Sequence, residues 1–261
     1  MKKIHPTAII TSEVEVGEDV EIGPYSIIEG NVKIGKNCKI GPYVHIQGHT
    51  EIDENTKIFT GAIIGSIPQD LKYKGEITYL KIGKNNIIRE FVTINPGTSL
   101  GEETLIGDNN LIMAYAHIAH NCKIGNNVII ANAGTLAGHV IIEDYAVIGG
   151  LVGIHQFCRV GKHAIIGGCS KVTMDIIPYV MADGHPARPY GINIVGLKRR
   201  NFTREKIEIL NKAYKIIFKS GMNTKEALEK LREINNCEEI KDIIEFIRLS
   251  QRGIAKERVN E

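Results

Sequence analysis

Tryptophan is absent from this 261-residue chain, and aromatic residues make up only 6% of it. A core must therefore consist mainly of aliphatic side chains. No apolar run is long enough for a membrane-spanning helix, and the first residues lack the apolar core of a signal peptide. Neither sign of charge dominates, because 32 basic residues face 30 acidic ones. That balance favours neither duplex nucleic acid nor a membrane surface, although a local basic patch is possible. We expect no nucleic-acid partner and no stable membrane insertion.

Cysteine pairs are also missing. The five cysteines are an odd number and include no Cys-x-x-Cys motif. This usage is typical of a reducing compartment rather than of a disulfide-stabilised secreted protein. The sequence therefore predicts a cytoplasmic protein.

Glycine is abundant, with 27 residues. It often directly follows an aliphatic residue, and these aliphatic-glycine pairs are separated by multiples of six residues. Every sixth residue is Ile or Val from Ile4 to Ile64, and Ile, Leu or Val from Ile106 to Val172. A hexad cannot bury a face alone, so hexads must stack, each supplying a short strand and a corner where Gly or Asn can adopt positive φ. Three hexads close one triangular coil of eighteen residues. The repeat predicts a mainly β fold, a parallel β-helix.

The fourth residue after each aliphatic position is usually small, which predicts that it packs inside the coil. Cys38, Cys122 and Cys158 occupy this position. We interpret these three thiols as inert core groups rather than as nucleophiles or metal ligands.

The repeat is interrupted at residues 70–81 and 100–105. Interruptions of a solenoid usually form loops on one face, which is often the binding face. For the first interruption we favour a functional loop over a neutral insertion.

The composition changes after Ile177, where three prolines precede helical periodicity. Thr203 is a candidate N-cap for a helix that ends near Gly221, Asn223 and Glu226 suggest a capping box for a second helix, and a third precedes Gly253. We expect two domains, a β-helix over residues 1–185 with loop 70–81, and a small α-helical domain over residues 186–261.

Three histidines recur on successive coils. His120, His139 and His155 fall in the hexads that begin at Ile118, Leu136 and Ile154, which are eighteen residues apart. Stacked strands lie about 4.8 Å apart, so the column would span roughly 10 Å and face outward. His117 is expected at the corner just before His120. Chance alignment of surface histidines is the alternative, but three consecutive coils favour a site.

Histidine is a general base suited to neutral pH, and the backbone N–H groups of Ala137-Gly138-His139 could stabilise an oxyanion. This combination suits acyl transfer from a thioester and needs no cofactor. The competing reading is a zinc site, since some β-helical hydratases bind zinc through three histidines. Two coils separate His120 from His155, too far for one ion within one chain, although subunits could share ligands; we expect no metal.

These residues, together with further motifs, resemble one family, the bacterial UDP-N-acetylglucosamine O-acyltransferases that begin lipid A synthesis. The likeness runs over nearly the whole chain. It rests on six motifs: Pro68-Gln69-Asp70-Leu71-Lys72-Tyr73, His117-Ile118-Ala119-His120, Leu136-Ala137-Gly138-His139, His155-Gln156-Phe157-Cys158, Gly167-Gly168-Cys169-Ser170 and Gly196-Leu197-Lys198-Arg199-Arg200.

The resemblance implies a homotrimer of left-handed β-helices with active sites between subunits. It implies that His120 takes the proton of the sugar 3-hydroxyl, which attacks an R-3-hydroxyacyl thioester on acyl carrier protein, and that the Gly138 N–H binds the oxyanion. It further implies that UDP-N-acetylglucosamine, the acyl donor or the carrier is bound by Asp70, Lys72, Gln69, His117, His139, His155, Gln156, Asn193, Arg199 and Arg200. Lys198, Arg199 and Arg200 would form a docking patch for the acidic carrier, or simply a solvated corner.

The chain departs from the family pattern at Asn121, where many members have Asp. A neutral amide can orient an imidazole but stabilises imidazolium less. Gly168 matches a position that measures acyl length, and Lys171 resembles a different ruler, so the chain length stays open.

The acceptor, the N-acetylglucosamine nucleotide or its 3-amino analogue, is also open. Other readings are the N-acyltransferase of the same pathway, which carries an added N-terminal domain, a coenzyme A-dependent acetyltransferase, and a non-catalytic scaffold.

Overall fold

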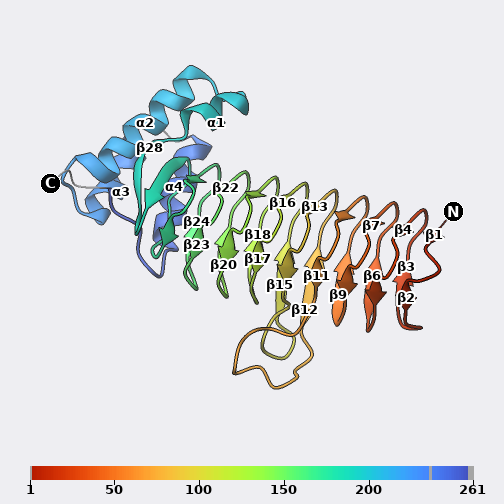
Figure 1. Cartoon of the computed structure of the whole chain (residues 1–261). Coiled ribbons are helices and arrows are strands. Elements are labelled where there is room, and N and C mark those ends of the chain that lie inside the picture. The colour runs from red at the N-terminus through yellow and green to blue at the C-terminus, as the bar shows by residue number, and fades with distance from the viewer. Residues whose placement is uncertain (1, 235–236, 258–261) are drawn as a thin grey trace.

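The computed structural model describes residues 2–234 and 237–257, and short parallel strands stack into three sheets that form the faces of a long prism (Figure 1). Within a sheet, the aliphatic residues of the repeat lie opposite one another, as in Ile22↔Ile40, while the preceding residue of each strand points outward. Eighteen residues separate these partners, so the coil length predicted from the hexads is confirmed.

The first sheet contains eleven strands. In spatial order they are β1 (Lys3–Ile4), β4 (Glu21–Ile22), β7 (Lys39–Ile40), β10 (Lys57–Ile58), β13 (Ile87–Ile88), β16 (Leu111–Ile112), β19 (Ile129–Ile130), β22 (Val147–Ile148), β25 (Ile165–Ile166), β27 (Val180–Gly184) and β28 (Ala187–Ile192).

The second sheet contains nine strands. They are β2 (Ile9–Ile10), β5 (Ile27–Ile28), β8 (His45–Ile46), β11 (Ile63–Ile64), β14 (Thr93–Ile94), β17 (His117–Ile118), β20 (Thr135–Leu136), β23 (Gly153–Ile154) and β26 (Lys171–Val172).

The third sheet contains eight strands. They are β3 (Glu15–Val16), β6 (Val32–Ile34), β9 (His49–Ile52), β12 (Tyr79–Ile82), β15 (Glu103–Ile106), β18 (Lys123–Ile124), β21 (Ile141–Ile142) and β24 (Arg159–Val160).

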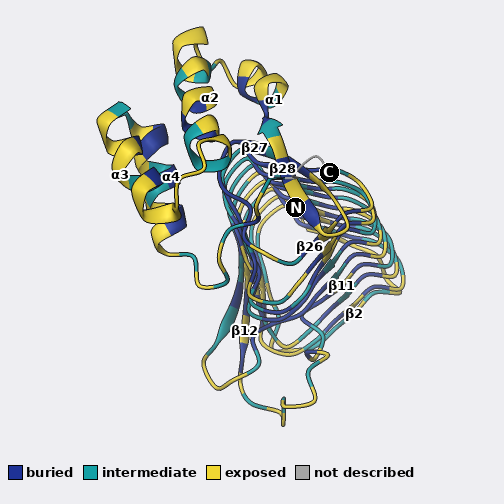
Figure 2. Cartoon of the chain, turned by 90° about the vertical axis from the view of Figure 1, so that its left-hand side faces the viewer, coloured by how far each residue is buried: buried dark blue, intermediate teal, exposed yellow. Residues whose placement is uncertain are grey.

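The strands of the coils are buried toward the inside of the prism (Figure 2). The buried residues are mainly isoleucines, together with small residues of the repeat. Cys38, Cys122 and Cys158 are fully buried there, as expected. Burial raises the pKa of the Cys122 thiol to about 12, which keeps it protonated near neutrality. The prediction that these three cysteines pack inside the coil is confirmed.

The glycine that follows each aliphatic residue has a different role from the one expected. Positive φ occurs two residues later, at Asn37 rather than at Gly35, and at Asn121 and His139 in later coils. Gly35 instead lies so close to the next coil that a Cβ would be 2.7 Å from the backbone N of Glu54. Close stacking of coils, not the corner conformation, therefore requires glycine there.

Two coils are longer than the rest. Ile52 pairs with Ile82, thirty residues on, and Ile82 pairs with Ile106, twenty-four residues on. The insertions therefore add twelve and six residues to an eighteen-residue coil, and the register is kept because both are whole hexads. They emerge as loops 65–78 and 95–102, between the second and third sheets, and the larger one projects from the middle of the stack (Figure 1). The predicted bounds, 70–81 and 100–105, were wrong, because β12 begins at Tyr79 and β15 at Glu103.

In the described residues, four helices lie at the end of the stack opposite the N-terminus, and α4 packs against the side of the third sheet (Figure 1). They are α1 (Ile194–Arg199), α2 (Arg204–Lys219), α3 (Thr224–Ile234) and α4 (Glu238–Arg248). The predicted caps are confirmed, since Thr203 accepts from Lys206 N–H, and Asn223 and Glu226 exchange reciprocal bonds. None of the described helices is long and apolar enough to cross a membrane.

Two elements of the C-terminal region were not predicted. The proline-containing stretch forms an antiparallel hairpin, β27 and β28, that extends the first sheet, and α1 follows directly. The expected boundary between residues 185 and 186 falls in the turn of this hairpin, and the division into two domains stays a prediction.

Candidate active site

One edge of the prism collects the residues singled out in the sequence. Strands β11, β14, β17, β20 and β23 are consecutive neighbours in the second sheet. The connections that follow them are loop 65–78, loop 95–102 and the corners that carry His120, Gly138 and His155. Both interruptions of the repeat therefore lie beside the histidines, on the same edge.

The three histidines do not form a straight column. Ile118, Leu136 and Ile154 are in register, but His120 lies two residues after its aliphatic partner, His139 three and His155 one. His120 is therefore equivalent to Gly138, and His139 to Asn121. The expectation that His117 lies at a corner was wrong, because it belongs to strand β17.

His120 is buried rather than facing outward, with only 8% of its surface exposed. Its ring lies over Gly138, where a Cβ would be 2.3 Å from the His120 Cε1 atom. The His139 ring meets it edge-on, with ring centres 5.2 Å apart, and Phe157 stacks on His139. Glycine at position 138 is therefore what admits the imidazole.

The two ring nitrogens of His120 face different groups. Nδ1 lies 2.9 Å from Oδ1 of Asn121, and Nε2 lies 3.7 Å from Oδ2 of Asp70 in loop 65–78. Asp70 Oδ1 accepts the N–H of Lys72, which orients its carboxylate. The long loop thus brings a carboxylate to the free nitrogen of the histidine.

The shorter loop reaches the other side of His120 through Asn121. The Asn121 Nδ2 group donates to Oε2 of Glu102 at 2.8 Å, and the Thr98 hydroxyl donates to Asn121 Oδ1 at 3.0 Å. The Asn121 hydrogen bond, chief among several causes, lowers the pKa of the Glu102 carboxyl. Glu102 was missed in the sequence, where the signal was its place inside the second interruption.

Two further histidines are held neutral. Burial, reinforced by the proximity of His120, lowers the pKa of His117 and that of His139. His117 Nδ1 lies 2.7 Å from the Thr93 hydroxyl. Neutral imidazoles can both donate and accept hydrogen bonds, which suits a polar uncharged ligand such as a sugar.

The other side chains expected to bind substrate near His120 are at least partly exposed to solvent. Gln69, Lys72 and His155 are exposed, and Gln156 is partly buried in the position equivalent to Gly138 one coil further on. On the outward side of the second sheet, His117, Thr135, Gly153 and Lys171 form one row. At about 4.8 Å per coil the row runs roughly 14 Å from His117 to Lys171.

The residues expected from the C-terminal region are placed by α1. Asn193 caps this helix, because its Oδ1 accepts the Gly196 N–H and its Nδ2 donates to the His163 carbonyl. Both polar groups of its side chain are thus already bonded. Arg199 is exposed, and the Arg200 guanidinium lies 4.5 Å from the centre of the Tyr145 ring.

Gly168 is exposed at a corner near Gly150.

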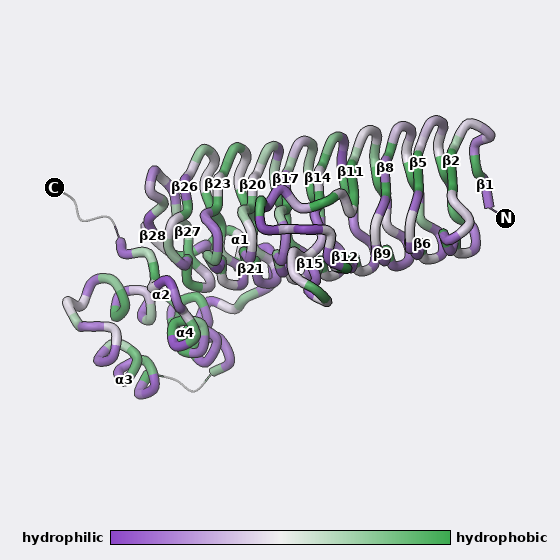
Figure 3. Tube along the Cα trace, turned by 90° about the horizontal axis from the view of Figure 1, so that it is seen from below, coloured by the Kyte–Doolittle hydropathy of each residue, from purple (hydrophilic) through white to green (hydrophobic). Residues whose placement is uncertain are grey.

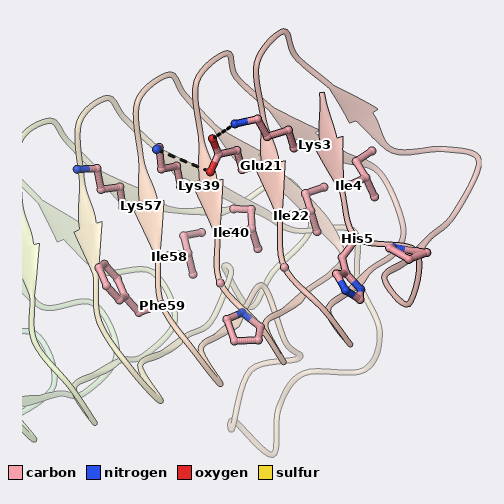
Figure 4. A pocket seen from close by; sticks show the side chains of 14 residues that line it. Lys3, Ile4, His5, Glu21, Ile22, Lys39, Ile40, Lys57, Ile58 and Phe59 are labelled. Atoms are coloured by element: carbon pink, nitrogen blue, oxygen red, sulfur yellow. Dashed lines mark hydrogen bonds and ion pairs between the residues drawn. The ribbon is translucent and has the colours of Figure 1, made fainter. Parts of the chain in front are cut away.

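A separate groove of about 650 Å³ lies over the outside of β1, β4, β7 and β10, at the N-terminal end (Figure 4). Strand residues and the corners after them line it, and it carries the ion pairs of Glu21 with Lys3 and Lys39. It contains no arrangement like that around His120. Among the described residues, no group of three or more His, Cys, Asp or Glu side chains could hold a metal ion.

Family models match both parts of the chain. The model described as "Bacterial transferase hexapeptide (six repeats)" matches residues 31–66 and 103–138, and "Udp N-acetylglucosamine O-acyltransferase; Domain 2" matches residues 175–255.

Curated relatives match over full length. An acyl-[acyl-carrier-protein]–UDP-N-acetylglucosamine O-acyltransferase of Burkholderia orbicola is 51% identical over 98% of this chain and 100% of its own, and one of Alkalilimnicola ehrlichii is 52% identical with the same coverage.

Solved structures agree. The UDP-N-acetylglucosamine acyltransferase from Campylobacter jejuni superposes with a TM-score of 0.93 at 44% identity, covering 98% of this chain and 100% of its own. That of Francisella novicida gives 0.94 at 40% identity, covering 97% and 94%. The predicted class, a left-handed parallel β-helix with C-terminal helices, is confirmed.

Proposed function

The chain belongs to the UDP-N-acetylglucosamine O-acyltransferase family and is an acyltransferase, and we propose that it moves an R-3-hydroxyacyl chain from acyl carrier protein to the 3-hydroxyl of UDP-N-acetylglucosamine, the first step of lipid A biosynthesis. The full-length identity to relatives with this named activity supports the proposal. No cofactor enters the reaction as we propose it.

The observation that carries the mechanism is the placement of His120 against Gly138, with one ring nitrogen tied down and the other facing the loop. In the proposed reaction, His120 Nε2 takes the proton of the sugar 3-hydroxyl as its oxygen attacks the thioester carbonyl. The carbonyl becomes an oxyanion, which the Gly138 N–H stabilises. Gly138 is buried beneath the His120 ring, and among the described residues its N–H makes no hydrogen bond, which supports this assignment.

Collapse of the intermediate breaks the carbon–sulfur bond. The ester stays on the sugar, and the thiolate of the carrier leaves and takes the proton from His120, which restores the neutral imidazole. Each proton and bond is thereby accounted for, and His120 serves first as base and then as acid.

The remaining residues are proposed as binding groups. Asp70, Lys72 and Gln69 would hold the sugar and donor from loop 65–78, while His117, His139, His155 and Gln156 would contact the sugar nucleotide. Asn193, Arg199 and Arg200 would bind the nucleotide or the carrier, and Gly168 and Lys171 would limit the acyl chain. The row from His117 to Lys171 supports a path for an extended chain along the second sheet.

We propose that the protein acts as a homotrimer, with substrates bound between subunits. One edge of the prism carries exposed apolar side chains on five of seven coils, interrupted at Gly61 and Ala133, which suits burial against another copy. They are Tyr25, Tyr43, Phe91, Tyr115 and Leu151, and two neighbouring pairs of them stack. The cytoplasm, expected from the cysteines, stays the proposed location.

The test is transfer of a radiolabelled R-3-hydroxyacyl group from acyl carrier protein by the wild-type protein, with UDP-N-acetylglucosamine and its 3-amino analogue as alternative acceptors. We expect acylation of UDP-N-acetylglucosamine that a chelator does not diminish. Transfer to the amino sugar alone would replace the acceptor, transfer to neither would reject the proposed reaction, and loss on chelation would favour a metal site.

A further inference from the structure

We propose that Glu102 is a positioning residue, which holds His120 in its proton-accepting tautomer through the side-chain amide of Asn121. Glu102 lies in loop 95–102, the second interruption of the repeat, for which the sequence suggested no function. The inference rests on the proposed function of His120 as general base.

The orientation of the Asn121 amide follows from its contact with Glu102. The Glu102 carboxylate only accepts hydrogen bonds near neutral pH, so the group 2.8 Å from its Oε2 must be the Asn121 NH₂. The Thr98 hydroxyl, 3.0 Å from Asn121 Oδ1, can donate or accept and is therefore compatible with this assignment. The Glu102 contact therefore points the Asn121 carbonyl oxygen toward His120.

The tautomer of His120 follows from that orientation. Asn121 Oδ1 lies 2.9 Å from Nδ1 of His120 and can only accept, so Nδ1 must carry the proton. In a neutral imidazole this leaves the lone pair on Nε2, which is directed at the proposed acceptor hydroxyl. Asp70 Oδ2 is 3.7 Å from Nε2, too far to hold a proton there by a hydrogen bond.

Glu102 is itself held in place for this role. Its Oε2 also accepts the Ser99 N–H at 3.1 Å, so the loop backbone fixes the carboxylate that fixes the amide. The Asn121 N–H in turn donates to the Thr104 hydroxyl at 2.8 Å, which anchors the backbone of the amide. The chain of contacts from loop to imidazole is thus continuous.

Without the carboxylate, the Asn121 amide can rotate. A flipped amide would present NH₂ to Nδ1, which would then have to accept, moving the ring proton to Nε2. An imidazole protonated at Nε2 cannot take the proton of the attacking hydroxyl. The defect would affect turnover and leave substrate affinity largely intact.

The test compares Glu102→Ala and Glu102→Gln with Glu103→Gln, a neighbouring carboxylate that pairs with Lys81 away from His120. We expect Glu102→Ala to lower kcat by roughly 10–100-fold with KM nearly unchanged. Glu102→Gln, which keeps an acceptor oxygen, should lose less, and Glu103→Gln should match the wild type. Nitrogen-15 NMR of labelled histidine in the substrate-free protein should show Nδ1 protonated in the wild type and a shift toward Nε2 in Glu102→Ala.

Rescue separates positioning from support of the loop. Adding Asn121→Asp to Glu102→Ala places an acceptor-only group beside Nδ1, so kcat should recover most of its loss. Unchanged kcat and unchanged NMR in Glu102→Ala would overturn the inference, as would a loss that Asn121→Asp does not repair. Absence of transfer by the wild type would instead reject the proposed function, and the NMR result would still test the tautomer.

Discussion

His120 is packed against a backbone that has no room for a side chain beneath it. A Cβ on residue 138 would lie 2.3 Å from Cε1 and 2.5 Å from Nε2 of His120, far inside contact distance. The same glycine supplies the unbonded N–H proposed for the oxyanion. The absence of a side chain at position 138 therefore allows the His120 ring to pack there and leaves the Gly138 N–H uncovered by a Cβ.

We predict that Gly138→Ala folds but loses about 10²-fold or more in kcat/KM, because displacing a reacting group by about 1 Å can have an effect of this size. Gly150→Ala is the matched control, since a Cβ there would make only an ordinary contact, 3.4 Å from the Asn132 carbonyl oxygen. Steady-state kinetics of both variants, with circular dichroism to verify folding, would check this. Activity of Gly138→Ala within a few-fold of wild type would contradict the packing argument.

Among elements, loop 65–78 is a two-hexad insertion in an otherwise regular stack. Its start is held by Asn95, whose Nδ2 donates to the carbonyl oxygens of Ser66 and Ile67. The strands on either side pair as if the loop were absent, with Ile52 opposite Ile82. The loop thus contributes to the site while the register of the coils is independent of it.

Deleting residues 67–78 should therefore leave a folded protein without transfer activity. The deletion removes twelve residues and restores an eighteen-residue coil, so Ile82 keeps its place in the series. Thermal unfolding should stay within a few degrees of wild type, since the removed side chains lie mostly outside the core. A deletion variant that retained full activity would exclude Asp70 and Lys72 from the reaction.

The segment between α1 and α2, which contains Phe202, is attached to the stack by a set of aromatic contacts. The His163 ring stacks between Tyr145 and Tyr179 and meets Phe202 edge-on. Burial, with help from the nearby Arg200 charge, lowers the pKa of His163 to about 4. The folded protein thus binds this proton less readily than the unfolded chain, where histidine titrates near 6.5.

The free energy of unfolding should therefore fall as pH drops from about 6.5 to about 4, and stay free of this effect above that range. The shift corresponds to at most about 3 kcal/mol, less after screening of a partly exposed ring. His163→Phe, which preserves the stacking, should lessen this fall, whereas His5→Phe, at an exposed ring, should not. Urea unfolding at a series of pH values is the measurement, and equal pH dependence in all three proteins would contradict it.

Over the whole molecule, hexad periodicity predicts the prism, because an aliphatic side chain at every sixth residue can be buried only when successive coils stack. Hydrophobic and hydrophilic segments recur from coil to coil along the stack (Figure 3). The hairpin β27–β28 was missed because its prolines interrupt the pattern, although Pro189 pairs within it. Helix α1, only six residues long, is too short for a periodic signal.

The site could be predicted only in part. The equal spacing of their hexads placed His120, His139 and His155 on one edge. The period does not specify how many residues after the aliphatic position each histidine lies. The covering of His120 depends on loop 65–78, whose path no repeat describes. Glu102 reaches His120 only through Asn121, and contacts across nineteen residues leave no mark in local sequence.

The proposed trimer makes a prediction about mass. Three chains of 28.8 kDa give about 86 kDa, from 3 × 28.8, in light scattering. Tyr43→Arg should shift the protein toward the monomer, because a charge would replace a stacked ring on the exposed apolar edge. Lys33→Arg, on the outward face of the third sheet, serves as control. A wild-type mass of 28.8 kDa would reject the trimer.

The most direct test of the account is the rate of acyl transfer by His120→Ala under saturating acyl carrier protein thioester and UDP-N-acetylglucosamine. A positioned general base contributes about 10²–10⁴-fold, so we predict a kcat lower by that factor in a protein that folds as the wild type does. A kcat equal to that of the wild type would show that His120 is not the base.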